Sequence, residues 1–375
     1  MQEQKQEKKA KAWNNKTWVI LFLTLSAFAL LAVAGLTAFV DPYFHFHKPV
    51  SGISYQLSNE RYQNYGIAKT FDYDAVIVGT SMSENFKPSQ MDAIYGVTSV
   101  KLPFSGGSHC EVRELLEYVF TQKPDLRCVV RNIDLFRAFD AKDDRDYPLS
   151  SYPLYLYDDN PWNDVGYLLN FQIFAEGTMI DLARTVLGKP TMTLDEYANW
   201  MNQYVFGPKG IQANYSRNKV VYTGNGSITD AEYETIRENF QRNVIDVADE
   251  HPNTTFYLYV SPYSIYFFDY VNEMGELDRY LAAQEFILKL LVGVENVRLY
   301  AFYEEKDLVT NPYNYRDVAH HHEDVNTQIL AWMKEGHGEI TSDNLDAYLE
   351  NVWEFYHTYD YDSLFEEDGF TIKEP

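Results

Sequence analysis

An uncharged, apolar stretch near the N-terminus constrains this chain more than any other feature. Residues 17–40 contain no charged side chain, and the sixteen residues before them carry five lysines against two glutamates. At about 1.5 Å per residue, a helix of this length would be about 36 Å long, enough to cross a hydrocarbon core of about 30 Å with some tilt. Lysines before the span and Asp41 after it indicate a cytoplasmic N-terminus. We therefore predict a cytoplasmic tail at 1–16, a transmembrane helix at 17–40 and an extracytoplasmic main domain.

Two other interpretations of this stretch are weaker. A secretory signal peptide has an apolar region of roughly 7–15 residues and a small-residue cleavage site, and this run is longer and ends without a clear site. A buried core helix would have one polar face, whereas this run is apolar on every face. An uncleaved signal anchor is favoured, which predicts a single-pass protein of the cell membrane.

Composition narrows the classes of partner. Beyond residue 16 the chain holds 53 acidic residues against 26 basic ones, a balance that does not suit nucleic acid, whose phosphates require Lys and Arg. We interpret the charge as solubilising rather than as an acidic ligand site. The 31 tyrosines suit both a core and sugar-binding clefts, because a tyrosine has one apolar and one polar end. The two cysteines, Cys110 and Cys128, are expected to be separate buried thiols, since a fold stapled by disulfides would use more.

Short apolar runs alternate with helical patterns along the rest of the chain. Such runs, ending at Gly or polar residues, are typical of buried parallel strands. Repeated strand, helix and strand predict an α/β fold whose parallel sheet is covered by helices on both faces. The predicted strands are 74–79, 98–104, 126–136, 254–261 and 296–303, and the predicted helices are 108–121, 228–250, 276–292 and 323–334.

The same patterns suggest how the chain is organised. Residues 41–70 are interpreted as an aromatic connector between the membrane and a domain at 71–335. A segment rich in Tyr, Asp and Pro interrupts the alternation at about 137–225 and is interpreted as a helical insertion. Residues 336–375 are expected to form a closing helix and a tail.

Two loops that follow predicted strands could carry chemistry, because parallel sheets bind ligands beyond the carboxyl ends of their strands. Ser81 lies just after the first strand at a glycine-containing turn, where a hydroxyl can project as a nucleophile; the plainer interpretation is a helix cap. Gly106 and Gly107 follow the second strand and could present N–H groups to an oxyanion; the plainer interpretation is a tight turn.

A third loop near residue 320 could activate such a serine. A serine hydroxyl needs an imidazole to take its proton and a carboxylate to orient that imidazole, and Asp317 and His320 can supply both. Three consecutive histidines at 320–322 can also be a polar surface loop. A metal site is not favoured, because adjacent histidines splay apart and no H-E-x-x-H pattern occurs. No metal or cofactor is predicted.

Together the loops resemble those of the SGNH (GDSL-like) hydrolase family, on G-T-S at 79–81 and D-x-x-H at 317–320. The resemblance covers about residues 70–335 and implies a flavodoxin-like α/β/α sheet. It also implies that Ser81 is the nucleophile, His320 the base and Asp317 its orienter, with the N–H groups of Ser81 and Gly106 in the oxyanion hole. With its anchor, the chain is similar to the teichoic-acid D-alanylation protein family and to alginate O-acetyltransferases.

The third block of that family, G-x-N-D, is altered here. The corresponding strand ends Arg131-Asn132-Ile133-Asp134, so either Asn132 or Asp134 could align with the family asparagine. Asn132 would donate a third hydrogen bond to the oxyanion, whereas Asp134 would supply no amide donor. Losing one such donor typically costs about 100- to 1,000-fold in rate.

Two functions follow from this sequence. The first is a membrane-anchored extracytoplasmic serine esterase or O-acyltransferase acting on a cell-surface glycan or glycopolymer, with a membrane-bound partner supplying the acyl donor by family analogy. The alternative is a catalytically inactive SGNH-like envelope module that binds glycan or a membrane partner. The altered third block and the abundant aromatics motivate the alternative.

Overall fold

The computed structural model describes residues 15–158, 160–217 and 226–375. Two compact units emerge from its internal contacts. The first unit comprises the N-terminal residues up to 42 together with 49–56 and 158–191, and the second comprises 43–48, 57–157 and 192–375. The segment predicted as an insertion is thus divided between the two units, and the predicted domain boundaries stay a prediction.

A six-stranded sheet in the order β2-β1-β3-β4-β5-β6 forms the centre of the second unit. The first five strands of that order run parallel and the edge strand β6 is antiparallel to β5. An order of 2-1-3-4-5 is the flavodoxin-like arrangement, so the predicted fold class is confirmed. The strands are β1 (Ala75–Gly79), β2 (Ser99–Pro103), β3 (Cys128–Ile133), β4 (Thr255–Val260), β5 (Val297–Ala301) and β6 (Glu339–Ile340), and a separate hairpin pairs β7 (Phe365–Glu366) with β8 (Thr371–Ile372).

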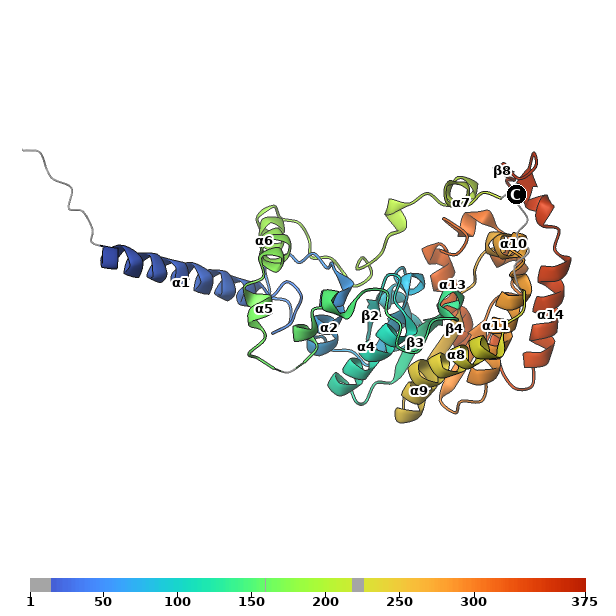
Figure 1. Ribbon diagram of the computed structural model, residues 1–375, viewed down its shortest axis with the longest axis horizontal. Helices are drawn as coiled ribbons and strands as arrows, with labels where there is room; N and C mark the ends of the chain where they lie inside the picture. The colour runs from blue at the N-terminus through green and yellow to red at the C-terminus, as the bar shows by residue number, and fades with distance from the viewer. Residues whose placement is uncertain (1–14, 159, 218–225) are drawn as a thin grey trace, which may run out of the picture. The chain divides into compact units, whose positions relative to one another are not determined.

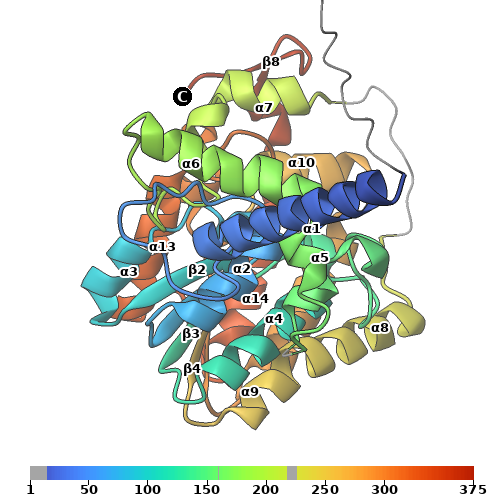
Figure 2. The same ribbon diagram turned by 90° about the vertical axis from the view of Figure 1, so that its left-hand side faces the viewer.

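Helices cover both faces of this sheet (Figures 1 and 2). On one face α4 contacts β1 and its neighbours α8 and α9, and α11 contacts β5; on the other, α3 contacts β2 and α13. A π-turn at Gln241–Ile245 joins α8 to α9, so the single helix expected at 228–250 contains an irregular turn. The helices of this unit are α2 (Glu60–Thr70), α3 (Pro88–Tyr95), α4 (His109–Gln122), α7 (Pro208–Asn214), α8 (Asp230–Phe240), α9 (Asp246–Glu250), α10 (Ile265–Glu273), α11 (Leu277–Leu291), α12 (Lys306–Val309), α13 (Glu323–Glu335) and α14 (Leu345–Thr358).

Local signals explain why the predicted helices match so closely. Ser108 caps α4 with its side chain, and Glu111 bonds back to the Ser108 N–H, which completes a capping box. Residues 75–78 of β1 have no exposed surface, as a continuous apolar run in a parallel sheet requires. Cys110 and Cys128 are both buried and form no disulfide, as expected.

Helix α2 lies inside the segment that the sequence analysis interpreted as a connector. Its buried residues include Gln63, Asn64 and Gly66, so its inward face carries no apolar stripe that periodicity could detect. A Cβ on Gly66 would lie 1.7 Å from the Tyr43 carbonyl oxygen, so only glycine permits this close backbone approach. Tertiary packing, rather than local periodicity, specifies this helix.

The first unit is built around α1 (Asn15–Val40). Among the described residues α1 is the one helix long and apolar enough to cross a membrane, and its most apolar window is not buried inside the protein. The orientation of the span across the membrane stays a prediction. The unit also contains α5 (Val165–Leu168), a π-helical stretch (Ile173–Thr178) and α6 (Met179–Val186).

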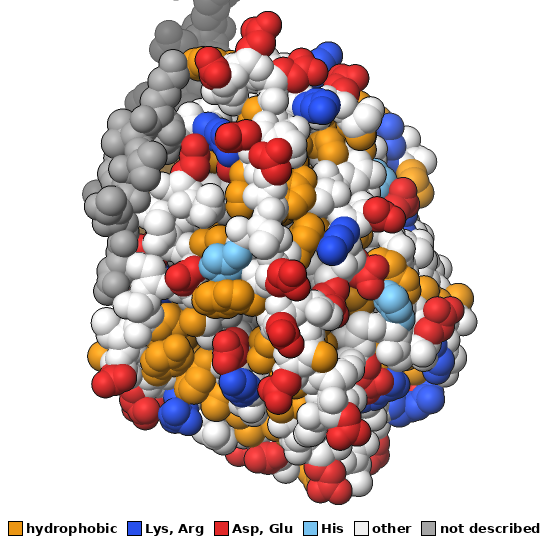
Figure 3. All heavy atoms as spheres, turned by 90° about the vertical axis from the view of Figure 1, so that its right-hand side faces the viewer, with side chains coloured by type: hydrophobic (Ala, Val, Ile, Leu, Met, Phe, Trp, Pro, Cys, Tyr) orange, Lys and Arg blue, Asp and Glu red, His pale blue; other side chains and the backbone are white. Residues whose placement is uncertain are grey.

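Acidic side chains are scattered, rather than gathered into one site, on the face of the molecule that Figure 3 draws. Figure 3 shows Asp and Glu side chains spread over one face of the molecule, with Lys and Arg between them. This distribution agrees with a solubilising role for the negative charge.

Candidate active site

Ser81 lies where strand β1 leaves the sheet. It opens a short 3₁₀ turn, Ser81–Ser83, whose N-cap is Thr80. The turn follows Gly79, which has φ 144° and whose added Cβ would lie 1.7 Å from Asn132 Oδ1. Only glycine avoids that clash, and the sharp turn after it directs the Ser81 side chain into a cleft at the carboxyl end of the sheet.

His320 and Asp317 reach the same cleft from the loop before α13. The Ser81 Oγ lies 2.9 Å from His320 Nε2, although the two residues are 239 positions apart. His320 Nδ1 lies 2.8 Å from Asp317 Oδ2 and 3.0 Å from Oδ1. Hydroxyl, imidazole and carboxylate thus form a continuous hydrogen-bonded chain, the arrangement that activates a serine nucleophile.

Several donors hold the Asp317 carboxylate in place. Its Oδ1 accepts the N–H of His320 at 2.8 Å and that of Ala319 at 2.9 Å, while Arg316 Nε lies 3.1 Å from Oδ2. Burial opposes ionisation of Asp317, but the hydrogen bonds from His320 and the two N–H groups outweigh it and lower the pKa to about 2. An ionised Asp317 accepts a hydrogen bond from the protonated Nδ1, which leaves the Nε2 lone pair facing Ser81.

Two backbone N–H groups are available to an oxyanion. The N–H groups of Ser81 and Gly106 have no acceptor within the part of the chain that the structure describes, and both residues line the cleft. Gly106 has φ 66°, and its carbonyl accepts a hydrogen bond from Arg137. Glycine adopts this left-handed conformation without strain. Of the three predicted oxyanion residues, Ser81 and Gly106 therefore line the cleft with their N–H groups available.

The side chain of the third predicted oxyanion residue, Asn132, bonds to Thr80 and Ser261 instead of entering the cleft. Its Oδ1 accepts the Thr80 N–H at 2.9 Å, and its Nδ2 lies 3.0 Å from Thr80 Oγ1 and 3.3 Å from Ser261 Oγ. Asn132 is 1% exposed and does not line the cleft. Asp134 does not line it either, because its carboxylate accepts hydrogen bonds from the Thr80 hydroxyl and from Tyr263. Both side chains position Thr80, one residue before Ser81.

Three side chains that were not predicted as site residues flank the triad: Arg316, Trp200 and Tyr204. The Arg316 guanidinium lies 4.4 Å from the ring centre of Trp200 and 3.8 Å from that of Tyr204. The Trp200 ring meets the His320 ring edge-on at 5.7 Å between centres. Arg316 directly precedes Asp317 in the sequence, whereas Trp200 belongs to the segment predicted as an insertion. The contact between Arg316 and Trp200 therefore forms only in the folded chain.

A pair of carboxyl groups, Glu60 and Glu84, also lines this cleft, whose volume is about 770 Å³. Glu84 is 4% exposed, and burial together with Glu60 raises its pKa well above the usual range. Burial also raises the pKa of Glu60, whose Oε2 accepts the Ser105 N–H at 2.5 Å. Beneath them the buried Lys101 donates to the Glu84 carbonyl, and burial lowers its pKa to about 7. A proton held by this pair gives the cleft a hydroxyl donor beside carboxylate acceptors.

The three consecutive histidines at 320–322 do not all lie on the surface. His321 is 2% exposed, so a polar surface loop is wrong for this residue. It is buried because it forms an isolated antiparallel bridge with Tyr315. His322 caps α13 by accepting the Asp324 N–H at 3.2 Å. Within residues 15–158, 160–217 and 226–375, no three His, Cys, Asp or Glu side chains gather as metal ligands would.

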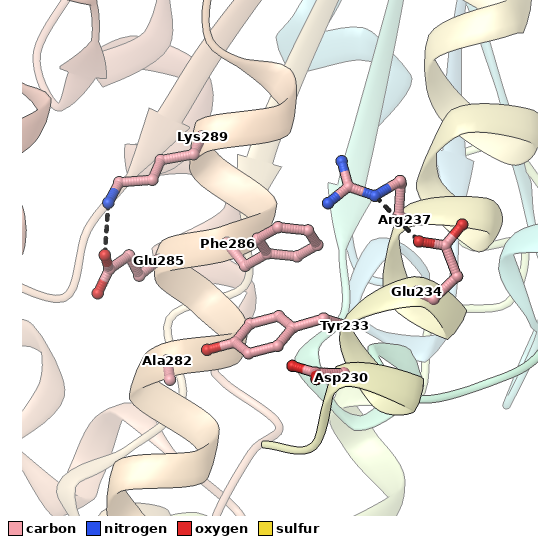
Figure 4. A pocket seen from close by; sticks show the side chains of 8 residues that line it. All are labelled: Asp230, Tyr233, Glu234, Arg237, Ala282, Glu285, Phe286 and Lys289. Carbon is pink, nitrogen blue, oxygen red and sulfur yellow. Dashed lines mark hydrogen bonds and ion pairs between the residues drawn. The ribbon is translucent and has the colours of Figure 1, made fainter. Parts of the chain in front are cut away.

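A second hollow lies between α8 and α11 and has a volume of about 420 Å³ (Figure 4). Its cations are already paired, Lys289 with Glu285 at 2.5 Å and Arg237 with Glu234 at 3.3 Å. Arg237 also packs over the Phe286 ring at 5.0 Å. Paired surface charges over a packed ring explain this hollow without a ligand.

The comparisons with known proteins add little to this geometry. No family model and no curated protein matches the sequence. One solved structure from Streptococcus pneumonia, described as a candidate platelet activating factor, is 10% identical and has a TM-score of 0.35. The match covers 77% of this chain and 91% of that chain. A likeness this low carries no argument about function.

Proposed function

We propose that this chain is a membrane-anchored serine esterase or O-acyltransferase that acts outside the cytoplasm on a cell-surface glycan or glycopolymer. The supporting observation is the chain of hydrogen bonds from Ser81 through His320 to Asp317. A buried carboxylate, an oriented imidazole and a serine at the rim of a cleft are the parts that acyl transfer requires.

In the proposed reaction, Ser81 Oγ attacks the carbonyl carbon of an ester while His320 Nε2 takes the hydroxyl proton. The resulting oxyanion accepts hydrogen bonds from the N–H groups of Ser81 and Gly106. His320 then returns the proton to the leaving alkoxide, and an acyl-Ser81 ester remains. Water or a sugar hydroxyl next gives its proton to His320 and attacks that ester. His320 returns this proton to Ser81 Oγ as the acyl–oxygen bond breaks, which restores the serine and yields an acid or a new ester.

The cleft walls support a carbohydrate as the substrate class. Tyr204 is 51% exposed and lines the cleft beside the buried Trp200, so the part of its ring that Arg316 does not cover offers apolar surface on which a sugar ring can pack. Glu60 and Glu84, which also line the cleft, offer groups that accept and donate hydrogen bonds, as a polyol requires. An anchor keeps such an enzyme at the envelope, where a large polymer is found. An acyltransferase would also need a donor, which a membrane-bound partner would supply.

A fluorophosphonate probe tests the proposed nucleophile directly. The probe should label the full-length wild type and should not label Ser81→Ala, because it reacts with an activated serine hydroxyl. Ser58 lines the same cleft and has no imidazole partner, so Ser58→Ala is the matched control and should stay labelled. Equal labelling of wild type and Ser81→Ala would remove Ser81 from the proposed role.

A second function, a binding module without catalysis, is favoured by one observation. The Asn132 amide bonds to Thr80 and Ser261, so an oxyanion would receive two donors instead of three. One missing donor corresponds to a loss of about 100- to 1,000-fold in rate. Glycan binding that survives the combined Ser81→Ala and His320→Ala changes, with no ester cleavage by wild type, would support the module over the enzyme.

A further inference from the structure

Helix α6 of the first unit turns its polar side toward the protein. Asp181 is 1% exposed, and its Oδ1 accepts the Gln56 N–H at 2.7 Å. Thr185, one turn further on, accepts the Ser54 N–H at 2.8 Å through its Oγ1. Asp181 and Thr185 are four residues apart and therefore lie on one face of the helix. The contacts that hold α6 in place are thus made by its polar face.

The outward side of the same segment is apolar. We call residues 162–187 the α5–α6 segment. Trp162 and Val186 are each 87% exposed and Phe171 is 82% exposed, which makes them the three most exposed large apolar side chains of the described residues. The exposed apolar side chains of α6, Met179, Ile180 and Val186, lie on one face, and the exposed Leu187 follows directly after the helix. A helix facing water has the reverse arrangement, so this face requires an apolar cover.

The attachment of the segment indicates what that cover is. Within the first unit, Tyr167 of α5 donates a hydrogen bond to Asp41 Oδ1 at 2.8 Å, and Asp41 is the first residue after α1. Tyr55 lies between Ser54 and Gln56, the two residues whose N–H groups bond to α6. Its hydroxyl donates to the Val40 carbonyl at 2.8 Å. Helix α1 also contacts α5 and the π-helical stretch (Figure 2). A segment tied to the end of a membrane span lies at the depth of the membrane–water interface.

We propose that the α5–α6 segment lies in the interface of the lipid bilayer next to α1, with its apolar side in the boundary between head groups and acyl chains. Tryptophan and phenylalanine are well suited to that depth, and a one-sided apolar helix is the usual form of an interfacial element. The proposal rests on α1 crossing the membrane and is independent of the chemistry at Ser81. The anchor then consists of a span and an interfacial helix, which together fix the rotation of the first unit about α1.

The charges of the segment make the proposal more specific. Within residues 162–187 the acidic Asp164, Glu176 and Asp181 face a single basic residue, Arg184, so there is no basic excess to attract anionic head groups. Burial of apolar side chains therefore drives the contact. The depth of the segment should be the same in neutral and in anionic membranes.

Site-directed quenching tests the location. The full-length chain carrying Phe171→Cys or Val186→Cys is labelled with an environment-sensitive fluorophore and placed in phosphatidylcholine vesicles with or without phosphatidylglycerol. Cys110 and Cys128 are buried, so the new thiol reacts preferentially. Nitroxides on the lipid acyl chains should quench these labels several-fold more strongly than a label at Leu149→Cys, an exposed apolar position of the second unit. Aqueous iodide should show the opposite order.

Three outcomes are distinguishable. Strong quenching by acyl-chain nitroxides in both lipid mixtures supports the proposal, with Phe28→Cys in α1 as the positive control. Iodide quenching equal to that at Leu149→Cys places the segment in water and overturns the proposal. Protection from both quenchers indicates a protein cover, such as a second copy of this chain, and also overturns it.

A charge on the apolar side provides an independent measurement. Val186→Glu introduces a carboxylate where the side chain makes few contacts, so the chain should fold as before. Acyl-chain quenching of the label at Phe171→Cys should then fall several-fold, because a charge at this depth is costly. Leu149→Glu should leave that quenching unchanged. Unchanged quenching in Val186→Glu, with the protein folded, would contradict the proposal.

Discussion

Helices α4 and α6 present opposite faces to the interior of their units. Helix α4 buries Val112, Leu115, Leu116 and Val119 and exposes its polar side. Helix α6 buries Asp181 and exposes Val186 and Leu187. The first arrangement is stabilised by water on the outside, and the second is reasonable only where the surroundings are apolar. Helix α4 is thus suited to a boundary with water, and α6 to the apolar boundary proposed for it.

The largest effect should come from the apolar interior beneath α4. Leu115→Ala removes a side chain with no exposed surface and should lower the free energy of unfolding by about 2–5 kcal/mol. Val186→Ala in α6 should change it by about 0.5 kcal/mol or less, because that side chain is 87% exposed. Denaturant unfolding of both variants in the same detergent measures the difference. Equal losses would show that Val186 is packed against protein.

The Asp317 carboxylate of the candidate site should have the next largest effect, and this effect depends on pH. The Asp317 pKa of about 2 lies below the unfolded value, so its stabilisation is present above about pH 4 and is lost as the pH falls through 2. A shift of this size corresponds to about 2 kcal/mol. The stability gap between wild type and Asp317→Asn should therefore narrow between pH 4 and pH 2. A gap that stays constant over that range would show that the lowered pKa is wrong.

The polar interior beneath α6 should contribute less. Thr185→Val keeps the shape of the side chain but removes the acceptor of the Ser54 N–H, and we expect a loss of about 1 kcal/mol. The matched change Thr358→Val, at an exposed threonine at the end of α14, should be nearly neutral. Thermal unfolding of the two variants measures this. A neutral Thr185→Val would mean that the inward polar face does not hold α6.

The smallest effect is expected at the carboxyl pair of the cleft, where the sign is reversed. The Glu84 pKa is raised by burial and by Glu60, so stability is present below the unfolded pKa and is lost as the pH rises through the folded value. Glu84→Gln should therefore be more stable than wild type at pH 8 and not at pH 4. Glu350→Gln, at an exposed position, serves as the control. A gain that does not vary with pH would contradict this assignment.

Local patterns in the sequence were sufficient for much of the scaffold. The uncharged run became α1, and the apolar runs became β1 to β5 within about three residues of the expected ends. Periodicity and capping succeed there because burial on one face and the bonding of a helix end depend on near neighbours. Helices α2 and α10 were missed, since their buried positions include polar and aromatic side chains without a simple period. Helix α3 was missed as well, although its buried residues Pro88, Met91 and Tyr95 have helical spacing, because it is only eight residues long.

Patterns in the sequence were enough to locate α1, the strands β1 to β5 and the helices between them that carry an apolar stripe, and to put Ser81 and the pair Asp317 and His320 on loops. Three contacts depend on tertiary structure. Ser81 Oγ lies 2.9 Å from His320 Nε2 across 239 residues, and the Asn132 amide bonds to Thr80. Helix α6 turns its polar side, with Asp181, toward the interior of its unit. The reason is physical. Strand and helix formation follow from neighbours a few residues apart, whereas the partner of a side chain is chosen by packing among segments remote in the chain.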